Sequence, residues 1–261
     1  MSQLLTVATW NVNSIKVRLA QALDWLRARQ VDVLALQELK MTTEDFPREA
    51  FAAAGYHAVV HGQKTYNGVA LLSRRPLEDV EIGWPEPTSD EQARIVAGTL
   101  DGVRVVNIYA PNGQEVGSEK YAYKLAWFDR LARRLASRHG PEAPLLVVGD
   151  FNVAPDERDV YDPEVFRGEI LFSEPERAAF ARLVSWGLCD VFRRVHPDAR
   201  QFSWWDYRMN AFRRNLGARI DLLLATEPLA ARAVSVEIDR GPRAAEKPSD
   251  HAPVIAAFAR D

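Results

Sequence analysis

The amino-acid sequence predicts an α/β fold in which β-sheets pack face to face with helices outside. Short, nearly continuous apolar runs recur along the chain, which is typical of strands covered on both faces. Amphipathic helical stretches separate some neighbouring runs, whereas one pair is joined by a tight turn, so both helix-linked and hairpin-linked strands are expected. No repeat, low-complexity segment or linker divides the 261 residues, so we expect a single domain over residues 1–261.

Eight apolar runs are predicted to be strands. They are residues 4–10, 31–38, 68–73, 93–100, 103–110, 143–150, 219–226 and 252–259. The fourth and fifth runs are joined by Asp101 and Gly102, a dipeptide that favours the two-residue turn of a β-hairpin.

Three amphipathic stretches are predicted to be helices. They are residues 18–30, 119–140 and 173–187. Ser173 and Glu176 have the spacing of a capping box, in which each residue satisfies the other's free backbone N–H. Gly140 and Gly187 are stop signals at the ends of the second and third helices.

Composition limits the classes of function. The chain has 33 Lys and Arg residues and 36 Asp and Glu residues, so any binding of nucleic acid must use a local basic surface. Its one cysteine, Cys189, excludes an internal disulfide framework and a cysteine-cluster zinc site, and we expect a buried thiol. The first residues lack a signal-peptide pattern, and no run reaches the roughly 18 apolar residues of a membrane span. We therefore expect a cytoplasmic protein without a membrane partner.

Polar residues lie where several predicted strands begin or end. They are Asn11 and Asn13, Gln37 and Glu38, Asn107, Tyr109 and Asn112, Asp150 and Asn152, Asp221, and Asp250 with His251. Each alone also fits an ordinary turn or surface role, as for Asp250 in the proline-bracketed stretch "KPSDHAPV". Asp221 is the exception, because an ionised carboxylate inside an apolar strand is costly without a partner. His251 is the candidate partner, since a carboxylate fixes the tautomer of an imidazole.

Together these residue types suit the hydrolysis of a phosphate ester. Mg²⁺ prefers oxygen ligands and needs only one or two carboxylates, which Glu38 and Asp250 would supply with Asn11 nearby. Phosphoryl transfer also needs an activated water and groups that stabilise charge on the phosphate and the leaving oxygen. Asp150 and Tyr109, with the remaining members of the set, are candidates for those tasks.

Five motifs carry a resemblance to a known family. "QE" after a strand, "NIYAPNG", "GDFNVAP", "RIDLLLAT" and "KPSDHAPV", in this order, resemble the exonuclease III family of abasic-site endonucleases, within the endonuclease/exonuclease/phosphatase superfamily. The similarity runs from residue 4 to residue 259. It implies a four-layered α/β sandwich of the DNase I-like type and a divalent metal, Mg²⁺ or Mn²⁺.

The resemblance also implies an activity. The expected reaction is hydrolysis of the phosphodiester 5′ to an abasic site in duplex DNA, leaving a 3′-hydroxyl. A 3′→5′ exonuclease activity and removal of blocking groups from 3′ ends are expected beside it. The expected partners are duplex DNA with abasic sites or 3′ ends, and a monomer is expected because no hydrophobic surface pattern argues otherwise.

Roles at the site follow from the same resemblance. The metal would be held or surrounded by Asn11, Glu38, Asp250, Asp150 and Asn152. Asp150 would orient or deprotonate the attacking water, and Asn152 would fix its carboxylate.

Three further residues complete the expected catalytic set. His251, held by Asp221, would contact the scissile phosphate or act as the base. Tyr109 would stabilise the developing charge or the leaving oxygen. The choice of base between Asp150 and His251 stays open at this point.

DNA contacts are expected in the segment 202–219. Arg208, Arg213, Arg214 and Arg219 form a basic patch without an acid in "RMNAFRRNLGAR", and Asn215 lies among them. Basic side chains of this kind neutralise DNA phosphates.

Aromatic residues precede this patch in "FSWWDYR". The resemblance places Trp204 in the wall of a pocket for an extruded, baseless sugar, and Arg208 against the duplex. Trp205 fits core packing equally well.

Two expectations remain. The acid-rich segment 156–177 fits the family only loosely and is expected to be a surface loop. A phosphatase or a nonspecific nuclease of the same fold is the alternative function, although the Trp204–Arg208 segment argues against it.

Overall fold

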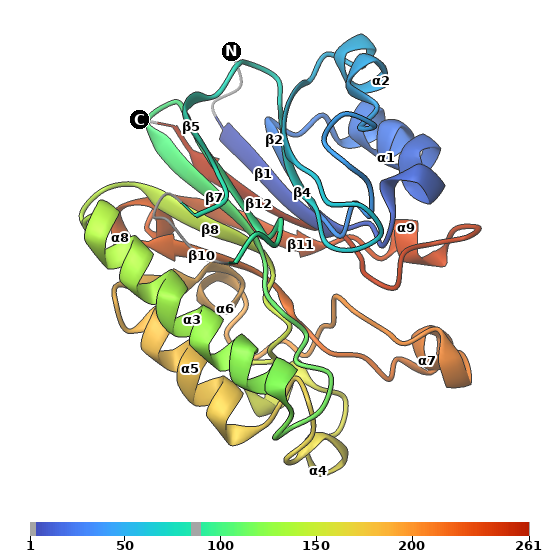
Figure 1. Cartoon of the computed structure of the whole chain (residues 1–261), viewed down its shortest axis with the longest axis vertical. Coiled ribbons are helices and arrows are strands. Elements are labelled where there is room, and N and C mark those ends of the chain that lie inside the picture. The colour runs from blue at the N-terminus through green and yellow to red at the C-terminus, as the bar shows by residue number, and fades with distance from the viewer. Residues whose placement is uncertain (1–3, 85–89, 261) are drawn as a thin grey trace.

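The computed structural model of the protein describes residues 4–84 and 90–260 (Figure 1). The predicted domain range of 1–261 extends beyond these residues at both ends and includes residues 85–89. Within the described part of the chain, no helix is long and apolar enough to cross a membrane.

Two six-stranded mixed sheets form the centre of the molecule, with strand orders β11-β12-β1-β2-β4-β3 and β5-β6-β7-β8-β10-β9. The first contains β1 (Leu4–Asn11), β2 (Val33–Gln37), β3 (His57–His61), β4 (Val69–Ser73), β11 (Ala233–Ile238) and β12 (Val254–Ala259). The second contains β5 (Glu78–Ile82), β6 (Ile95–Leu100), β7 (Val103–Tyr109), β8 (Leu145–Asp150), β9 (Leu188–Asp190) and β10 (Asp221–Thr226).

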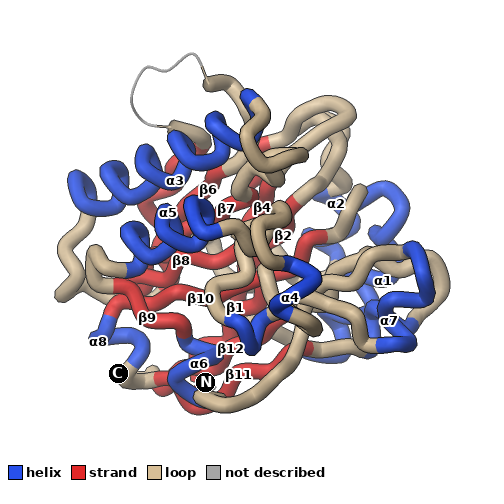
Figure 2. Tube along the Cα trace, turned by 90° about the horizontal axis from the view of Figure 1, so that it is seen from below, coloured by secondary structure: helices blue, strands red, loops and turns tan. Residues whose placement is uncertain are grey.

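The longer helices cover the two outer faces. The helices of the described residues are α1 (Ile15–Arg29), α2 (Arg48–Ala53), α3 (Glu119–Arg138), α4 (Pro163–Phe166), α5 (Glu174–Val184), α6 (Val191–Val195), α7 (Ala211–Arg214), α8 (Glu227–Ala230) and α9 (Gly241–Ala244), with 3₁₀ turns at Glu157–Asp159 and Arg208–Asn210. In both views α1 and α2 flank one side of the sheets, and α3 and α5 flank the other (Figures 1 and 2).

Three apolar layers hold this arrangement together. One lies between the sheets and joins Val7 and Val33 of the first sheet to Val105 and Leu146 of the second. Another packs the second sheet on α3 and α5, and the third packs the first sheet on α1 and α2. The predicted α/β sandwich of two sheets flanked by helices is therefore confirmed.

Two parallel strand pairs bring polar residues to one end of the sheets. β1 and β2 are parallel and place Asn11 beside Gln37. β7 and β8 are parallel and place Tyr109 beside Asp150, while the antiparallel β10 begins opposite Asp150 with Asp221. Because the carboxyl ends of parallel strands meet at one edge of a sheet, residues far apart in the sequence become neighbours there.

The eight predicted strands are confirmed, with ends that differ by up to two residues. Asp101 and Gly102 have φ angles of 52° and 74°, as a two-residue hairpin turn requires. The capping box at Ser173 and Glu176 is present. The sequence missed β3, β5, β9 and β11, which are the four edge strands. Edge strands face solvent more and lack the continuous apolar run of a central strand, as the largely exposed β5 illustrates.

The prediction of a surface loop at 156–177 is wrong. Leu171, Phe172 and Glu176 are buried in this segment, and so is Asp159, which pairs with Arg219 at 2.6 Å and also with Arg193. Two of the acids that suggested a solvated loop, Asp159 and Glu176, have cationic partners from distant parts of the chain.

The structure also corrects two smaller predictions, for Arg219 and Cys189. Arg219 is only 1% exposed and also pairs with Asp190 at 2.7 Å, so it does not belong to a basic surface. Cys189 is half-buried on an edge strand rather than fully buried.

The buried pair gives a test of the segment's role. Asp159→Asn is expected to lower the free energy of unfolding by about 3 kcal/mol, because it removes a carboxylate from a buried guanidinium. Glu164→Gln, in the exposed pair with Arg167 of the same segment, is the matched control and is expected to leave stability unchanged. Urea unfolding followed by tryptophan fluorescence measures both, and equal small effects would mean that the segment is a loop after all.

Candidate active site

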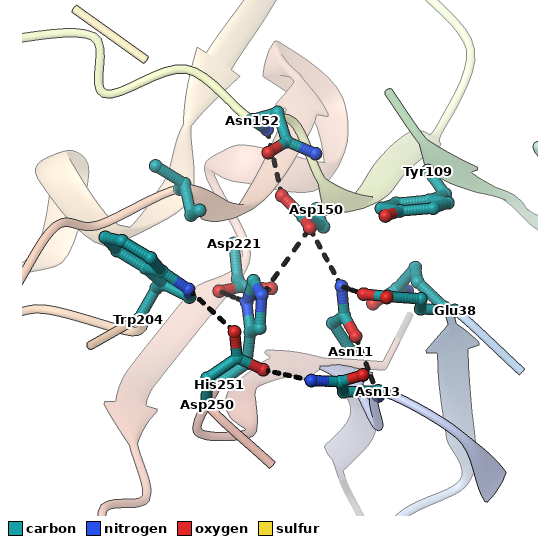
Figure 3. A network of polar contacts seen from close by, with 12 residues as sticks. Asn11, Asn13, Glu38, Tyr109, Asp150, Asn152, Trp204, Asp221, Asp250 and His251 are labelled. Atoms are coloured by element: carbon teal, nitrogen blue, oxygen red, sulfur yellow. Dashed lines mark hydrogen bonds and ion pairs between the residues drawn. The ribbon is translucent and has the colours of Figure 1, made fainter. Parts of the chain in front are cut away.

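The polar residues at the strand ends converge between the two sheets (Figure 3). Asn11 ends β1 of the first sheet and Glu38 directly follows β2, whereas Tyr109, Asp150 and Asp221 come from the second sheet. The turn that precedes β12 adds the last members.

His251 and Asp221 form a buried pair. The imidazole Nδ1 lies 2.8 Å and 3.1 Å from the two carboxylate oxygens, so the predicted contact is confirmed. Ser203 Oγ donates to the same carboxylate at 2.6 Å, and the backbone N–H of His251 donates to Ser249 Oγ at 3.2 Å. Nε2 then lies 3.7 Å from Asp150 Oδ2.

The charges around His251 determine its protonation. Burial alone would lower the pKa of this imidazole, but the carboxylates of Asp221 and Asp150 raise it to about 10. At neutral pH the ring is therefore a cation, and its Nε2–H points toward the site as a donor.

Asp150 is held from two directions. Its Oδ2 accepts a hydrogen bond from Asn11 Nδ2 at 2.9 Å, and its Oδ1 accepts one from the backbone N–H of Asn152 at 2.9 Å. Burial raises the pKa of Asp150 to about 7, against the lowering effect of the His251 cation, and the negative charge of Asp221 adds to the rise. The group can thus exist with or without a proton near neutral pH.

Asn152 fixes this carboxylate through its backbone. The backbone of Asn152 is in the left-handed region, with φ 51°, which turns its N–H toward Asp150. The Asn152 side chain bonds on the side away from Asp150: Nδ2 donates to Ala110 O at 3.0 Å, and Oδ1 accepts from Asn112 Nδ2 at 3.1 Å. The structure therefore does not direct this amide at a metal.

Glu38 lies on the other side of Asn11. The same Asn11 amide nitrogen donates to Glu38 Oε2 at 2.9 Å, so the carboxylates of Glu38 and Asp150 approach one atom. Lys40 Nζ pairs with Glu38 at 2.9 Å and donates to Asn13 Oδ1 at 2.6 Å.

Asp250 faces the set from the turn before β12. Its Oδ1 accepts from Asn13 Nδ2 at 2.9 Å, and its Oδ2 accepts from Trp204 Nε1 at 3.0 Å. Burial alone would raise the pKa of Asp250, but the His251 cation and these two hydrogen bonds lower it. The group therefore stays a carboxylate.

Tyr109 is the remaining member of the predicted catalytic set. Burial of its hydroxyl, together with the negative charges of Glu38 and Asp150, raises the pKa of this phenol well above its usual value. The Arg94 guanidinium lies 5.0 Å from the ring centroid. Tyr109 therefore remains an O–H donor.

The donor set fits a hard divalent cation. Glu38 and Asp250 offer carboxylate oxygens, and Asn11 and Asn13 hold them without adding charge. The tightest acid–histidine cluster in the described residues is a different one, made of Asp150, Asp221 and His251. Since Nδ1 of that histidine is already bonded to Asp221, this cluster has the geometry of a proton-handling group.

The predicted DNA contacts divide into a cavity wall and an exposed turn. Trp204 is half-buried and lines an apolar cavity of about 470 Å³. The other apolar side chains of the wall include Phe166, Ile170, Leu171, Met209 and Leu216. Trp205 is fully buried and belongs to the core, where its Nε1 donates to Asn215 Oδ1 at 3.3 Å.

The exposed turn carries three arginines. Arg208, Arg213 and Arg214 are exposed together with Asn215. Arg208 pairs with Asp206 at 2.6 Å, an acid just outside the segment 208–219 in which the sequence showed no acid.

Sequence reasoning missed three residues of the site. Lys40, Ser203 and Ser249 each hold a residue that was predicted. The available signal was position, because Lys40 follows Glu38 by two residues and Ser249 directly precedes Asp250.

Comparison with known proteins identifies the family of the chain. The model of the Endonuclease/Exonuclease/phosphatase family matches residues 8–251. The chain belongs to this family.

Relatives in the family resemble the chain over nearly its whole length. It is 37% identical to an exodeoxyribonuclease III from Haemophilus influenzae over 96% of this chain and 98% of that protein. A 3′-5′ exonuclease from Neisseria meningitidis is 45% identical, with a TM-score of 0.93 and coverage of 97% of this chain and 99% of the other. An AP endonuclease from Archaeoglobus fulgidus is 41% identical, with a TM-score of 0.94 and the same coverage.

The bond from Trp204 to Asp250 gives a prediction about metal binding. Trp204→Phe keeps an aromatic wall but removes the N–H, so the dissociation constant for Mn²⁺ is expected to rise about tenfold. Trp204→Ala is expected to raise the dissociation constant for Mn²⁺ as much and also to remove the aromatic wall of the cavity. Calorimetric titration of metal into the DNA-free protein measures this, with Trp186→Phe, packed against the second sheet and its helices, as the control. Unchanged affinity in Trp204→Phe would contradict the role of the indole N–H.

Proposed function

We propose that the protein is a metal-dependent DNA-repair nuclease. It hydrolyses the phosphodiester 5′ to an abasic site in duplex DNA, leaves a 3′-hydroxyl, and also removes nucleotides and blocking groups from 3′ ends. The observation that carries the proposal is the buried Asp150 between the His251 cation and Asn11, near Asp250, which bonds to Trp204 of the apolar cavity wall. The names of the relatives, which cover exonuclease and AP endonuclease activities, support it.

Asp150 is the base in this proposal. Its pKa of about 7, raised by burial, suits a group that takes a proton from water near neutral pH. His251 is already protonated, so it serves as a hydrogen-bond donor to the scissile phosphate and Asp221 keeps it charged and oriented. Tyr109 donates its O–H to a phosphate oxygen or to the leaving oxygen.

A divalent cation, Mg²⁺ or Mn²⁺, would be held by Glu38 and Asp250 with Asn11 alongside. When bound, it supplies positive charge that offsets the charge of the phosphate. Lys40 pairs with Glu38 and Asn13 donates to Asp250, and these contacts keep the two carboxylates in place.

Substrate selection uses the two surfaces beside the site. The apolar cavity walled by Trp204 accepts a deoxyribose without a base, since a sugar that carries a base must also be unstacked and unpaired before it can enter. Arg208, Arg213, Arg214 and Asn215 contact the phosphates of the duplex.

The remaining parts of the proposal concern the state of the protein. A single domain spanning the chain acts as a monomer, because the residues above all come from one copy. The relatives from Haemophilus influenzae and Neisseria meningitidis are bacterial, and because chromosomal DNA of bacteria lies in the cytoplasm, we place the reaction in that compartment.

The direct test uses a labelled duplex with one tetrahydrofuran abasic analogue. The wild-type protein is expected to cut on the 5′ side of the lesion with Mg²⁺, to stop when EDTA removes the metal, and to shorten 3′ ends in the same reaction. His251→Ala is expected to lower the rate at least about a hundredfold, because the buried cation beside the phosphate is lost.

The control is His57→Ala, which changes an exposed histidine on an edge strand and is expected to cut normally. An intact lesion strand under all conditions would reject the repair function. Release of phosphate from inositol phosphates, or equal cutting of undamaged DNA, would then favour the alternative phosphatase or nonspecific nuclease.

A further inference from the structure

A buried ion pair lies behind the site, between α3 and α5. Lys124 and Glu176 are both 0% exposed and pair with each other. Lys124 Nζ also donates to the backbone carbonyl of Asn152 at 2.7 Å and to that of Asn112 at 3.1 Å. An ammonium has three N–H donors, so all three are used.

Glu176 is fixed by the start of its own helix. Its carboxylate accepts the backbone N–H of Ser173 at 3.0 Å and that of Leu171 at 3.2 Å, and it also bonds the Ser173 hydroxyl. This places a rigid negative charge beside Lys124 and determines where the ammonium lies.

The ammonium joins the two loops that carry the site. Asn112 follows β7, and Asn152 follows β8. Among the described residues, Lys124 is the donor that the structure gives to either backbone carbonyl. Holding the Asn152 carbonyl fixes the left-handed turn, and that turn aims the Asn152 N–H at Asp150 Oδ1.

The stability of the fold alone does not explain why Lys124 and Glu176 are buried as an ion pair. Removing two charges from water costs several kcal/mol per ion, and an apolar pair of similar volume is often as stable or more so. Directional hydrogen bonds to two carbonyls are what an apolar pair lacks.

We propose that Lys124 and Glu176 are a positioning pair for the nuclease reaction, holding the loops after β7 and β8 so that Asn152 keeps the Asp150 carboxylate in its reactive orientation. The inference rests on the function proposed above. Neither residue touches the substrate, and both act through the backbone of Asn152.

The test replaces both charges at once, because removing one would leave the other buried and unpaired. The double variant Lys124→Met/Glu176→Gln keeps side chains of similar length at both positions, so the protein is expected to fold. Its kcat on the tetrahydrofuran duplex is expected to fall between about tenfold and a hundredfold, as for a misplacement near 1 Å, while KM changes little.

The control lies on the same helix. Arg134 is 4% exposed, donates to Gly83 O at 2.8 Å and pairs with Glu81, far along α3 from the two loops. Arg134→Met is expected to lower the melting temperature without changing kcat. A folded double variant with wild-type kcat would overturn the proposal.

Two measurements do not depend on cleavage. In the double variant, amide hydrogen exchange at Asn152 is expected to be faster than in the wild type, whereas it is unchanged in Arg134→Met. In the wild type, the Lys124 ammonium is expected to give a slowly exchanging ¹⁵N–¹H signal at neutral pH, which exposed lysines do not give.

These readouts separate the two proposals. If the wild type cuts no abasic duplex, the function fails, but faster exchange at Asn152 still supports the positioning role. If the double variant does not fold, the Lys124 ammonium signal of the wild type is the test. Its presence would support the inference, and its absence would overturn it.

Discussion

The hydrogen bond from Asn11 to Asp150 joins the end of a strand in one sheet to the end of a strand in the other. Asp150 is 1% exposed, and a buried carboxylate is costly unless hydrogen bonds and opposite charge compensate for the lost water. Asn11, the backbone N–H of Asn152 and the His251 cation supply that compensation from three parts of the chain. The relative position of the two sheets is therefore a condition for the chemistry.

Strand register is the second constraint. Asp150 pairs with Tyr109 on one side and with Asp221 on the other, so three reactive groups share one row across the second sheet. A slip of one residue in β8 would turn the Asp150 side chain to the opposite face of the sheet. The inter-sheet core, through residues such as Val105 and Leu146, holds this register.

Sequence reasoning succeeded where the physical signal is local. An acid inside the apolar run of β10 needs a partner, and the partner inferred for Asp221 is the one observed, at 2.8 Å. The central strands were found because they are apolar throughout. The edge strands were not, because solvent on one side removes the pattern that identifies a strand.

Long-range pairing accounts for the other failures. Asp159 and Arg219 are 60 positions apart, and composition alone assigned one to a solvated loop and the other to a basic patch. Lys124 and Glu176 are 52 positions apart and were not singled out as partners. Buried ion pairs of this kind become visible only when the sheets and helices are placed. The reactive residues at the strand ends can thus be predicted from the sequence, whereas most of the residues that hold them in position cannot.

The central claim is that Asp150, His251 and Asp221 act as one unit at the meeting point of the sheets. Single-turnover cleavage of the tetrahydrofuran duplex by Asp150→Asn, Asp221→Asn and the double variant tests it most directly. Groups that act as a unit give non-additive losses, so the double variant is predicted to be no slower than the slower single variant. Losses that multiply in the double variant would contradict the account, because they would mean that the two carboxylates contribute independently.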